Sequence, residues 1–427
     1  MNILFNQIRV VSPTQNIDET VNLWIKNGII LNCDNSNPIV DTETEIVDAK
    51  EFIAAPGFFD MHVHLRDPGF EYKEDIKTGS DSAANGGYTG IVCMPNTFPV
   101  IDNAAVVDYI RNKSKDYLVD VYPSAALTQK SEGKLLTEMF ELNDCGVVMF
   151  TDDGHCVHNS KILNRAFEYA STRDLLIAEH CEDKNLTEEF TVNESKLSTK
   201  LGLKGYPNVA ESSILYRDIE IAKHVGNCRY HAMHLSTMES IELIRLAKAN
   251  NQRVTCEVTP HHFTINDSII VKFDTNTKMN PPLRSQQDID VIIEGIKDGT
   301  IDCIATDHAP HALHEKEVEF EYAPNGVIGL ETSIGISLTE LHWKHKVDLK
   351  RIIELMSVNP RRICKLPNII IKKDEKANLT IFAPNEEWTV NKELFKSKSK
   401  NTPFNNYKLK GKPKYSINNN RLYKTTL

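Results

Sequence analysis

The sequence predicts an α/β protein: a (β/α)8 TIM-like barrel with a small discontinuous β domain formed by both termini. Three observations lead to this prediction. The central part of the chain alternates apolar strand-like runs with amphipathic stretches, the pattern of βα units around a parallel sheet. Eight such units follow one another, which is the strand count of this barrel. Strand-like runs without helices between them occupy both ends of the chain.

The two ends are expected to form one satellite sheet. Residues 1–52 contribute short strands at 3–5, 21–23, 28–31 and 45–47, and residues 371–427 contribute strands at 378–382, 388–390 and 414–417. Residues 53–370 form the barrel between them. Neither terminal part offers a complete domain alone, so the sequence favours pairing across the termini.

The barrel strands are expected at 58–65, 90–95, 119–125, 146–151, 175–179, 229–235, 253–258 and 302–306. Helical periodicity falls between them, at 104–114, 161–171, 213–225, 240–249 and 286–298. Active sites of such barrels lie at the C-terminal ends of the strands. The residues that end the strands are therefore the candidates for function.

Composition excludes several classes of protein. The formal net charge of −10 over 427 residues argues against binding to nucleic acid or to an anionic membrane surface. No apolar run approaches ~18 residues, so no membrane span is expected. The start of the chain lacks the features of a signal peptide. Nine cysteines without a Cys-x-x-Cys pair favour reduced thiols and a cytoplasmic protein.

The first barrel strand carries the strongest local signal. Alternation along residues 58–65 puts Asp60, His62 and His64 on one face, and Arg66 continues that face beyond the strand. Two imidazoles at this spacing can bind one metal ion. The same His-x-His pattern also occurs on ordinary polar strands, so the other strand ends decide between the two interpretations.

Those ends are rich in metal-competent residues. Strand four runs into Asp152 and Asp153, strand five into His180, strand six into His234 and strand eight into Asp307. A single histidine at such a place is more often a satisfied core residue, but the set predicts a metal site. Four imidazoles and a carboxylate exceed the needs of one tetrahedral zinc ion.

Two metal ions would need a bridging ligand. No lysine lies between Lys134 and Lys161, so a carboxylated lysine on strand four is excluded. Alternation from Val147 and Met149 puts Asp153 rather than Asp152 on the inner face, provided that the strand stays regular. His261 and His262 end strand seven and could line the site, but we do not expect them to bind metal; the other histidines are expected in loops, behind the site or in solvent.

The chain resembles a class I dihydroorotase of the amidohydrolase superfamily, a group of cyclic amidohydrolases. The resemblance rests on motifs spread over nearly the whole chain: Asp60-Met-His-Val-His-Leu-Arg-Asp-Pro-Gly69, Met94-Pro-Asn-Thr97, Thr151-Asp-Asp-Gly154, Glu179-His-Cys-Glu-Asp183, His231-Ala-Met-His-Leu-Ser-Thr237, Lys278-Met-Asn-Pro-Pro-Leu-Arg284, Asp307-His-Ala-Pro-His311, Gly329-Leu-Glu-Thr332 and Lys398-Ser-Lys-Asn-Thr-Pro-Phe404.

The resemblance implies reversible cyclisation of N-carbamoyl-L-aspartate to L-dihydroorotate in pyrimidine (UMP) biosynthesis, with two zinc ions per subunit. It assigns His62 and His64 to one ion, His180 and His234 to the other, and Asp153 to the bridge. Asp307 would bind metal and act as general acid and base. The substrate-binding positions implied are His64, Arg66, Asn96, Asn280, His311, Asn325 and Gly326.

One position departs from the family. Asn325-Gly326 stands where the family usually has Phe-Gly, in the loop 319–329 that is expected to close over the substrate. Backbone contacts would survive this change and apolar packing would not. The resemblance leaves open a homodimer and a complex with aspartate carbamoyltransferase. The alternatives are another cyclic-amide hydrolase (dihydropyrimidinase, hydantoinase or allantoinase) and a non-catalytic scaffold for the carbamoyltransferase.

Overall fold

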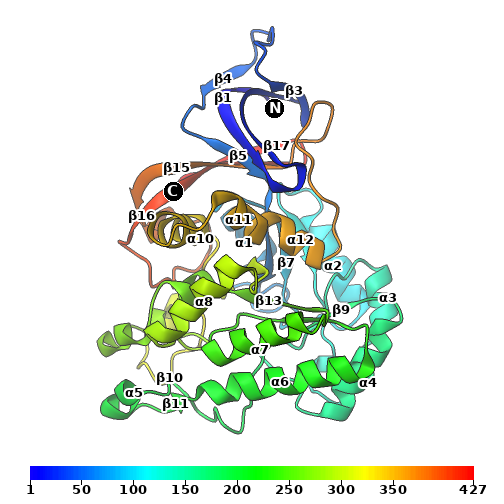
Figure 1. Ribbon diagram of the computed structural model, residues 1–427, viewed down its shortest axis with the longest axis vertical. Coiled ribbons are helices and arrows are strands. Elements are labelled where there is room, and N and C mark those ends of the chain that lie inside the picture. Colours follow the sequence, from blue (N-terminus) through cyan, green and yellow to red (C-terminus); the bar gives the residue numbers. More distant parts are fainter.

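The computed structural model describes all 427 residues and has two parts, a β domain above a barrel (Figure 1). The β domain contains β1 (Asn2–Ser12), β2 (Ile17–Lys26), β3 (Ile29–Asp34), β4 (Glu45–Asp48), β5 (Ile53–Pro56), β15 (Leu379–Thr389), β16 (Lys408–Asn418) and β17 (Arg421–Lys424). Their order in one sheet is β17-β16-β15-β5-β1-β2-β3, and β4 pairs with β1.

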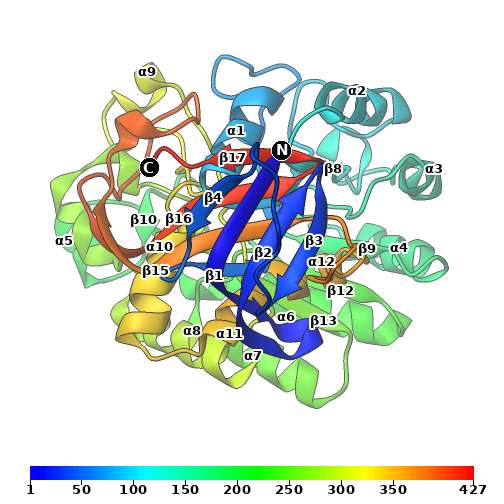
Figure 2. The same cartoon turned by 90° about the horizontal axis from the view of Figure 1, so that it is seen from above.

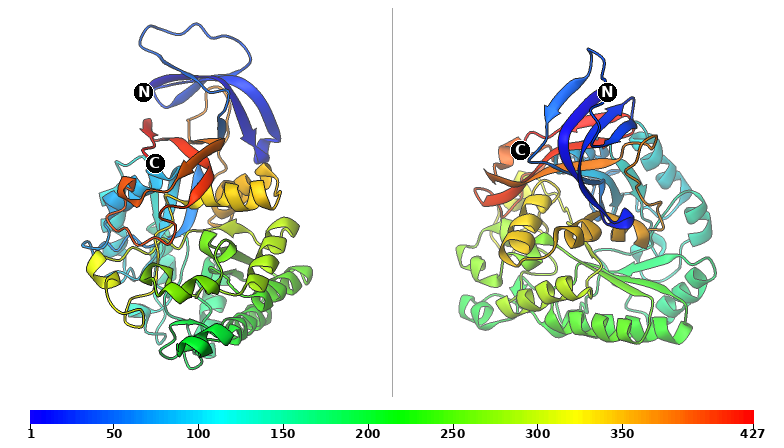
Figure 3. Two further views of the ribbon diagram at one scale, coloured as in Figure 1. Left: turned by 90° about the vertical axis from the view of Figure 1, so that its left-hand side faces the viewer. Right: turned by 45° about the horizontal axis from the view of Figure 1, so that its top comes forward.

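The two ends of the chain meet where β15 pairs antiparallel with β5, with Leu379 opposite Pro56. Both views in Figure 3 show the N-terminal strands next to the C-terminal ones. Phe5, Ile25, Leu379 and Ile381 share the apolar core of this sheet. The prediction of a discontinuous β domain is confirmed.

The barrel strands are β6 (Phe58–Val63), β7 (Tyr88–Cys93), β8 (Asp120–Pro123), β9 (Leu176–Glu179), β12 (Arg229–Ala232), β13 (Val254–Val258) and β14 (Cys303–Ile304). They form two parallel sheets, β6-β7-β8 and β9-β12-β13-β14. Single parallel bridges close the circle. Phe150 bridges to Ala125 and Ile177, and Val63 bridges to His308. The fourth predicted strand is therefore reduced to one bridging residue, and the eighth is shorter than expected.

Helices surround these strands, as the view from above shows (Figure 2). They are α1 (Ile76–Asn85), α2 (Ala104–Ser114), α3 (Met139–Asp144), α4 (Ser160–Ser171), α6 (Asn208–Val225), α7 (Met238–Ala249), α8 (Gln286–Asp298), α10 (Ser333–Ser337), α11 (Leu349–Ile353) and α12 (Asn359–Ile363). The excursion between β9 and α6 contains β10 (Val192–Asn193), α5 (Lys196–Leu201) and β11 (Gly205–Tyr206), and α9 (Leu313–Lys316) follows β14. No helix is both long and apolar enough to span a bilayer.

Side-chain caps explain where several helices begin. Asn103 accepts hydrogen bonds from the first-turn amides of α2, and Ser285 forms a capping box with Asp288 in α8. Both helices have the predicted bounds. Helix α6 begins at Asn208 rather than at residue 213, and α1, which no helical prediction covered, begins with a capping box at Asp75.

Candidate metal centre

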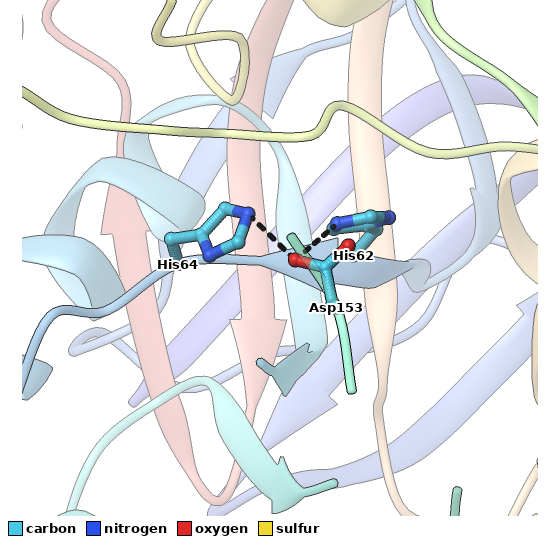
Figure 4. Close-up of side chains that lie close together, drawn as sticks. All are labelled: His62, His64 and Asp153. Atoms are coloured by element: carbon cyan, nitrogen blue, oxygen red, sulfur yellow. Dashed lines mark ion pairs between the residues drawn. The ribbon is translucent and has the colours of Figure 1, made fainter. Parts of the chain in front are cut away.

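Six side chains meet at the C-terminal ends of the barrel strands. His62 and His64 come from β6 and its extension, and Asp153 follows the bridging residue of strand four (Figure 4). The Nε2 atoms of His62 and His64 lie 3.6 and 3.4 Å from Asp153 Oδ2. Asp307 closes this side, with its Oδ1 3.5 Å from His62 Nε2 and 3.1 Å from His64 Nε2.

A second group shares Asp153 with the first. His180 follows β9 and His234 lies two residues beyond β12. His180 Nδ1 lies 2.9 Å from His234 Nε2, and His234 Nε2 lies 3.8 Å from Asp153 Oδ1. The ligand atoms of each group, His62–His64–Asp153 and Asp153–His180–His234, lie within 4.8 Å of one another. All five residues are buried.

Outer partners fix the direction in which three of the imidazoles face. Asn96 Oδ1 lies 2.9 Å from His64 Nδ1, Glu182 Oε2 lies 2.9 Å from His180 Nε2, and Glu257 Oε1 lies 2.7 Å from His62 Nδ1. In each case the other ring nitrogen faces the centre. Such outer hydrogen bonds are the usual way in which metal-binding histidines are oriented.

The field inside the cluster favours positive charge. Burial tends to raise the pKa of Asp153, but the neighbouring imidazoles of His62 and His234 hold it well below its usual range. Burial tends to lower the pKa of His62, but the carboxylates of Asp153 and Glu257 raise it well above its usual value. Against the effect of burial, His64 and His62 lower the pKa of Asp307 to about 2.

These residues fit metal ions. Nδ1 of His62 is engaged by Glu257, whereas its Nε2 is fully buried without a hydrogen-bond partner although it faces two carboxylates. A buried polar atom without a partner is uncommon in proteins and calls for an explanation. A cation among the Nε2 atom and the carboxylate oxygens would satisfy it. Because Asp153 belongs to both groups, two ions could share it.

Three of the site residues have an unusual backbone. Arg66, His234 and Asp307 have φ angles of +62°, +30° and +46°, in a region that residues other than glycine rarely adopt. Such conformations concentrate at functional sites. They also correct one expectation: β6 ends at Val63, so Arg66 is aimed by a left-handed turn and not by strand alternation.

Arg66, Asn280 and His311, the predicted substrate contacts, lie near the cluster. Arg66 Nε donates to the carbonyl of Pro310 at 3.2 Å, and the charges of Asp307 and Asp153 act on its guanidinium. Asn280 Nδ2 donates to Glu182 Oε2 at 3.1 Å. Asn280 Oδ1 is buried without a partner in the protein, and His311 Nδ1 is buried without a hydrogen bond, 3.7 Å from Glu315 Oε2.

Within the long segment that follows β14, residues 325–326 lie against His311. His311 Nε2 donates to the carbonyl of Asn325 at 2.8 Å, and the side-chain oxygen of Asn325 is buried without a partner. Gly326 has φ of +130°, and a Cβ there would lie 2.8 Å from Ala309 Cβ and 3.1 Å from His311 Nε2. Only glycine fits this place, so the backbone of 325–326 can approach the site closely.

Several neighbouring polar residues are bonded to groups outside the cluster. Asp152 accepts from the backbone N–H of Thr128 at 2.9 Å, on the other side of the chain from Asp153. His262 is engaged by Thr259 and by the carbonyl of Pro281, whereas His261 Nε2 is buried without a partner. His308 lies 3.5 Å from Glu74.

Sequence reasoning missed Glu182, Glu257 and Asn401. Glu182 lies two residues after His180, and Glu257 lies in the buried strand β13, where an acidic residue is a detectable signal. Asn401 comes from the C-terminal part of the chain. It accepts from the backbone N–H of His311 at 3.2 Å and donates to the carbonyls of Ala309 and Gly326 at 3.0 and 3.1 Å. Its distance in sequence hides it.

A basic cavity of about 580 Å³ lies at the opposite ends of the strands and is lined by Arg111, Arg173, Arg229 and Lys365, among others. Partners within the chain already engage these cations: Arg173 pairs with Asp144, Lys365 pairs with Asp174, and Arg111 and Arg229 donate to backbone carbonyls. The histidine–carboxylate cluster is therefore the better candidate for chemistry.

Comparison with known proteins finds relatives over nearly the whole chain. A family model described as dihydro-orotase-like matches residues 52–240. A dihydroorotase of Syntrophus aciditrophicus is 46% identical over 413 residues, 96% of each chain. One from Ruminiclostridium cellulolyticum is 44% identical over 418 residues, 98% of this chain and 97% of its own.

Solved structures of the same fold include an L-hydantoinase (dihydropyrimidinase) from Arthrobacter aurescens. It has a TM-score of 0.86 and 23% identity, and the match covers 99% of this chain and 96% of that one. A dihydropyrimidinase from Brevibacillus agri has a TM-score of 0.85 and 19% identity, with coverage of 100% and 95%. These likenesses show that the barrel prediction is correct.

Proposed function

Because the chain belongs to the dihydroorotase family, we propose that it interconverts N-carbamoyl-L-aspartate and L-dihydroorotate, with release of water on ring closure. This places it in pyrimidine (UMP) biosynthesis. One observation carries the proposal at the site: six metal-competent side chains from five strand ends form one cluster, and Asp153 belongs to both groups of ligands.

The two groups of ligands support a centre of two zinc ions. His62 and His64 would hold one ion and His180 and His234 the other, with Asp153 shared and Asp307 beside the first. Imidazole and carboxylate ligands without thiolate are typical of hydrolytic zinc sites. Bound zinc supplies Lewis acidity, which lowers the pKa of water and polarises a carbonyl oxygen.

Asp307 is the proposed proton carrier. In the hydrolytic direction its carboxylate takes a proton from the attacking water and passes it to the ring nitrogen that leaves, so that the ring amide opens. In the ring-closing direction it takes the proton from the ureido nitrogen and returns it to the departing oxygen. The position of Oδ1, 3.1 Å from His64 Nε2, supports this role because the carboxylate faces the reacting region.

The substrate carboxylate is assigned to Arg66, whose planar guanidinium offers two parallel donors. His64, Asn96, Asn280 and His311 complete the proposed contacts with the rest of the substrate. The buried side-chain oxygen of Asn280 has no partner in the protein, and the N–H groups of the substrate could donate to it. The backbone at Asn325 and Gly326 would cover the substrate from the loop.

The other cyclic-amide hydrolases are the nearest alternative. The solved hydantoinases and dihydropyrimidinases share the fold at 23% identity or less, whereas dihydroorotases reach 46%. Among cyclic amidohydrolases, those alternatives resemble the type with a carboxylated lysine on strand four, where this chain has Asp153. A non-catalytic scaffold would be expected to lack ligands, and this chain has all six.

Turnover and zinc content of the purified protein test the proposal together. We expect turnover of carbamoyl aspartate and dihydroorotate, no turnover of hydantoin or allantoin, and close to two zinc ions per chain. His180→Ala should remove a zinc equivalent and nearly all turnover. Full activity with unchanged metal content in this variant would contradict the ligand assignment.

The proposal also places the protein in the reducing cytoplasm, which the nine free cysteines support. Light scattering of the pure protein, alone and mixed with aspartate carbamoyltransferase, tests for a homodimer and for a complex with that enzyme.

A further inference from the structure

Glu257 joins the two halves of the proposed metal centre. It lies in β13 and is 1% exposed. Its Oε1 accepts from His62 Nδ1 at 2.7 Å and from the backbone N–H of His234 at 3.3 Å. Its Oε2 lies 3.2 Å from His231 Nε2. One carboxylate thus contacts a ligand from each group without being a ligand itself.

The contact with His62 selects one tautomer. A carboxylate only accepts hydrogen bonds, so the 2.7 Å contact requires a hydrogen on His62 Nδ1. In the neutral imidazole the lone pair then lies on Nε2, the buried atom that faces Asp153 and Asp307. Metal ions bind neutral imidazole through this lone pair. Glu257 therefore holds His62 in the form that can bind metal.

The contact with His234 acts on the backbone. The φ angle of His234 is +30°, which a residue with a side chain adopts only when its surroundings enforce it. The same Oε1 atom that orients His62 accepts the N–H of His234. The side chain of one proposed ligand and the main chain of another are thus fixed to a common point.

Glu257, His231 and Cys303 could themselves form a metal site, since their ligand atoms lie within 4.8 Å of one another. The contacts argue against this. Both oxygens of Glu257 face N–H groups, and His231 Nδ1 faces Thr255 Oγ1 at 2.8 Å. The thiol of Cys303 points at Met61 Sδ at 3.5 Å. Glu257 therefore acts on imidazoles and not on an ion.

We propose that Glu257 is a positioning residue that raises the metal affinity of the centre by fixing the tautomer of His62 and the backbone of His234. The proposal rests on the proposed function, because it takes both histidines as metal ligands. Outer-layer partners of this kind typically change metal affinity by about 10- to 100-fold.

Glu257→Gln tests the proposal. The amide keeps the shape of the side chain but has one acceptor oxygen and one donor nitrogen, so it cannot accept from both His62 and His231. Zinc affinity is measured by competition between the loaded protein and a chromophoric chelator. We expect at least one zinc equivalent to bind about 10- to 100-fold more weakly.

Glu331→Gln is the matched control. Glu331 is 3% exposed and accepts from Asn85 Nδ2 and from the backbone N–H of Ser397, with no contact to the cluster. It should destabilise the fold to a similar extent and leave zinc affinity unchanged. Unfolding of both variants in urea separates loss of stability from loss of metal.

The outcomes are distinguishable. Wild-type protein that takes up no zinc would contradict the proposed metal centre itself. Wild-type protein that binds zinc, with equal affinity in Glu257→Gln, would overturn this inference alone. If the Gln variant does not fold, Glu257→Asp replaces it, since the shorter side chain keeps the charge but withdraws it from His62. The same weakening is expected, and unchanged affinity would again overturn the inference.

Discussion

At the scale of single residues, Asp153 is the side chain on which both ligand groups depend. Its two oxygens face different histidines, Oδ2 towards His62 and His64 and Oδ1 towards His234. Asp153→Asn keeps the size and removes the charge that two cations would share. We predict loss of at least one zinc ion and of most activity, measured by metal analysis and turnover.

Asp152→Asn is the control for this prediction, because Asp152 is equally buried and bonds to Thr128 instead. It should keep its metals. The wild-type apoprotein should also reload zinc without any response to bicarbonate, since an aspartate needs no carboxylation. Sensitivity of Asp152, or a requirement for bicarbonate, would contradict the bridge.

A second prediction at this scale concerns Arg66. Arg66→Lys replaces a planar pair of donors by a single ammonium, so the carboxylate of the substrate would lose one charge-assisted hydrogen bond. We expect kcat/KM to fall by the equivalent of ~1–3 kcal/mol. Zinc content should not change, because Arg66 is not among the candidate ligands. Unaltered kinetics would show that Arg66 does not hold the carboxylate.

Sequence alone could predict Asp153 but not Glu257. Period-two alternation from Val147 and Met149 pointed to Asp153, and the backbone keeps that direction although strand four is only a bridge. Glu257 acts across the barrel on His62, 195 positions away. No local pattern carries that pairing, because strand neighbours in a barrel are set by closure of the sheet.

At the scale of elements, hydrogen bonds from Lys316 fix the loop 310–330 to the barrel and to itself. Lys316 Nζ donates to the carbonyls of Thr275 and Pro324 at 3.0 and 2.7 Å, and the backbone N–H of Gly326 donates to the carbonyl of Lys278 at 3.0 Å. We predict that the loop opens and closes as a lid. Hydrogen exchange at 319–329 should slow when ligand binds, and equal exchange with and without ligand would contradict gating.

The same lysine predicts a pH dependence. Burial, reinforced by the charge of Lys278, lowers the pKa of Lys316 to about 7. Above pH 7 the folded protein releases a proton that the unfolded chain keeps up to pH ~10.4, so the unfolded state binds more protons and stability rises with pH. Relative to Lys316→Met, the wild type should therefore gain stability between pH 7 and 9, by at most ~1.4 kcal/mol per pH unit.

Urea unfolding of both proteins at pH 6, 7, 8 and 9 measures this difference, and comparing them cancels the pH dependence of every other group. A difference that stays constant from pH 6 to 9 would show that Lys316 remains charged.

Helix bounds could be predicted where side chains near the helix end determine them. Helices α2 and α8 have the expected bounds because a side-chain cap starts each one. Strands four and eight were overestimated for a different reason. Apolar alternation reports burial, whereas a strand also needs paired backbone, and at Phe150 only single bridges to Ala125 and Ile177 form.

At the scale of the whole molecule, the C-terminal part returns to the barrel mouth after forming β15. Segment 396–402 contacts Glu74 and Glu331 on the barrel before Asn401 reaches the loop. The pairing of the two ends in one sheet could be predicted from their strand-like composition. The return of this segment could not, because it is a polar stretch without strand or helix periodicity, and its partners Glu74 and Glu331 lie far away in the sequence.

Asn401 therefore connects the C-terminal part of the chain to His311 and Gly326, two of the proposed substrate contacts. Its side chain satisfies the buried N–H of His311 and the buried carbonyls of Ala309 and Gly326, and its own carbonyl accepts from Ile328 at 3.0 Å. Asn401→Ala would leave three backbone groups without partners. Each unsatisfied buried group is unfavourable by ~1–3 kcal/mol, so the loop would shift to regain solvent or other partners.

We predict that Asn401→Ala raises KM for dihydroorotate and leaves zinc content unchanged, because Asn401 bonds to His311 and Gly326, two proposed substrate contacts, and to none of the candidate metal ligands. Asn405→Ala is the matched control, since Asn405 lies four residues further along the chain but accepts only from the backbone N–H of Lys392. Steady-state kinetics and metal analysis of both variants decide the matter. Loss of zinc in Asn401→Ala would mean that the segment also supports the metal centre. Unchanged kinetics would mean that the bonds of Asn401 are not needed to hold the loop in its active position.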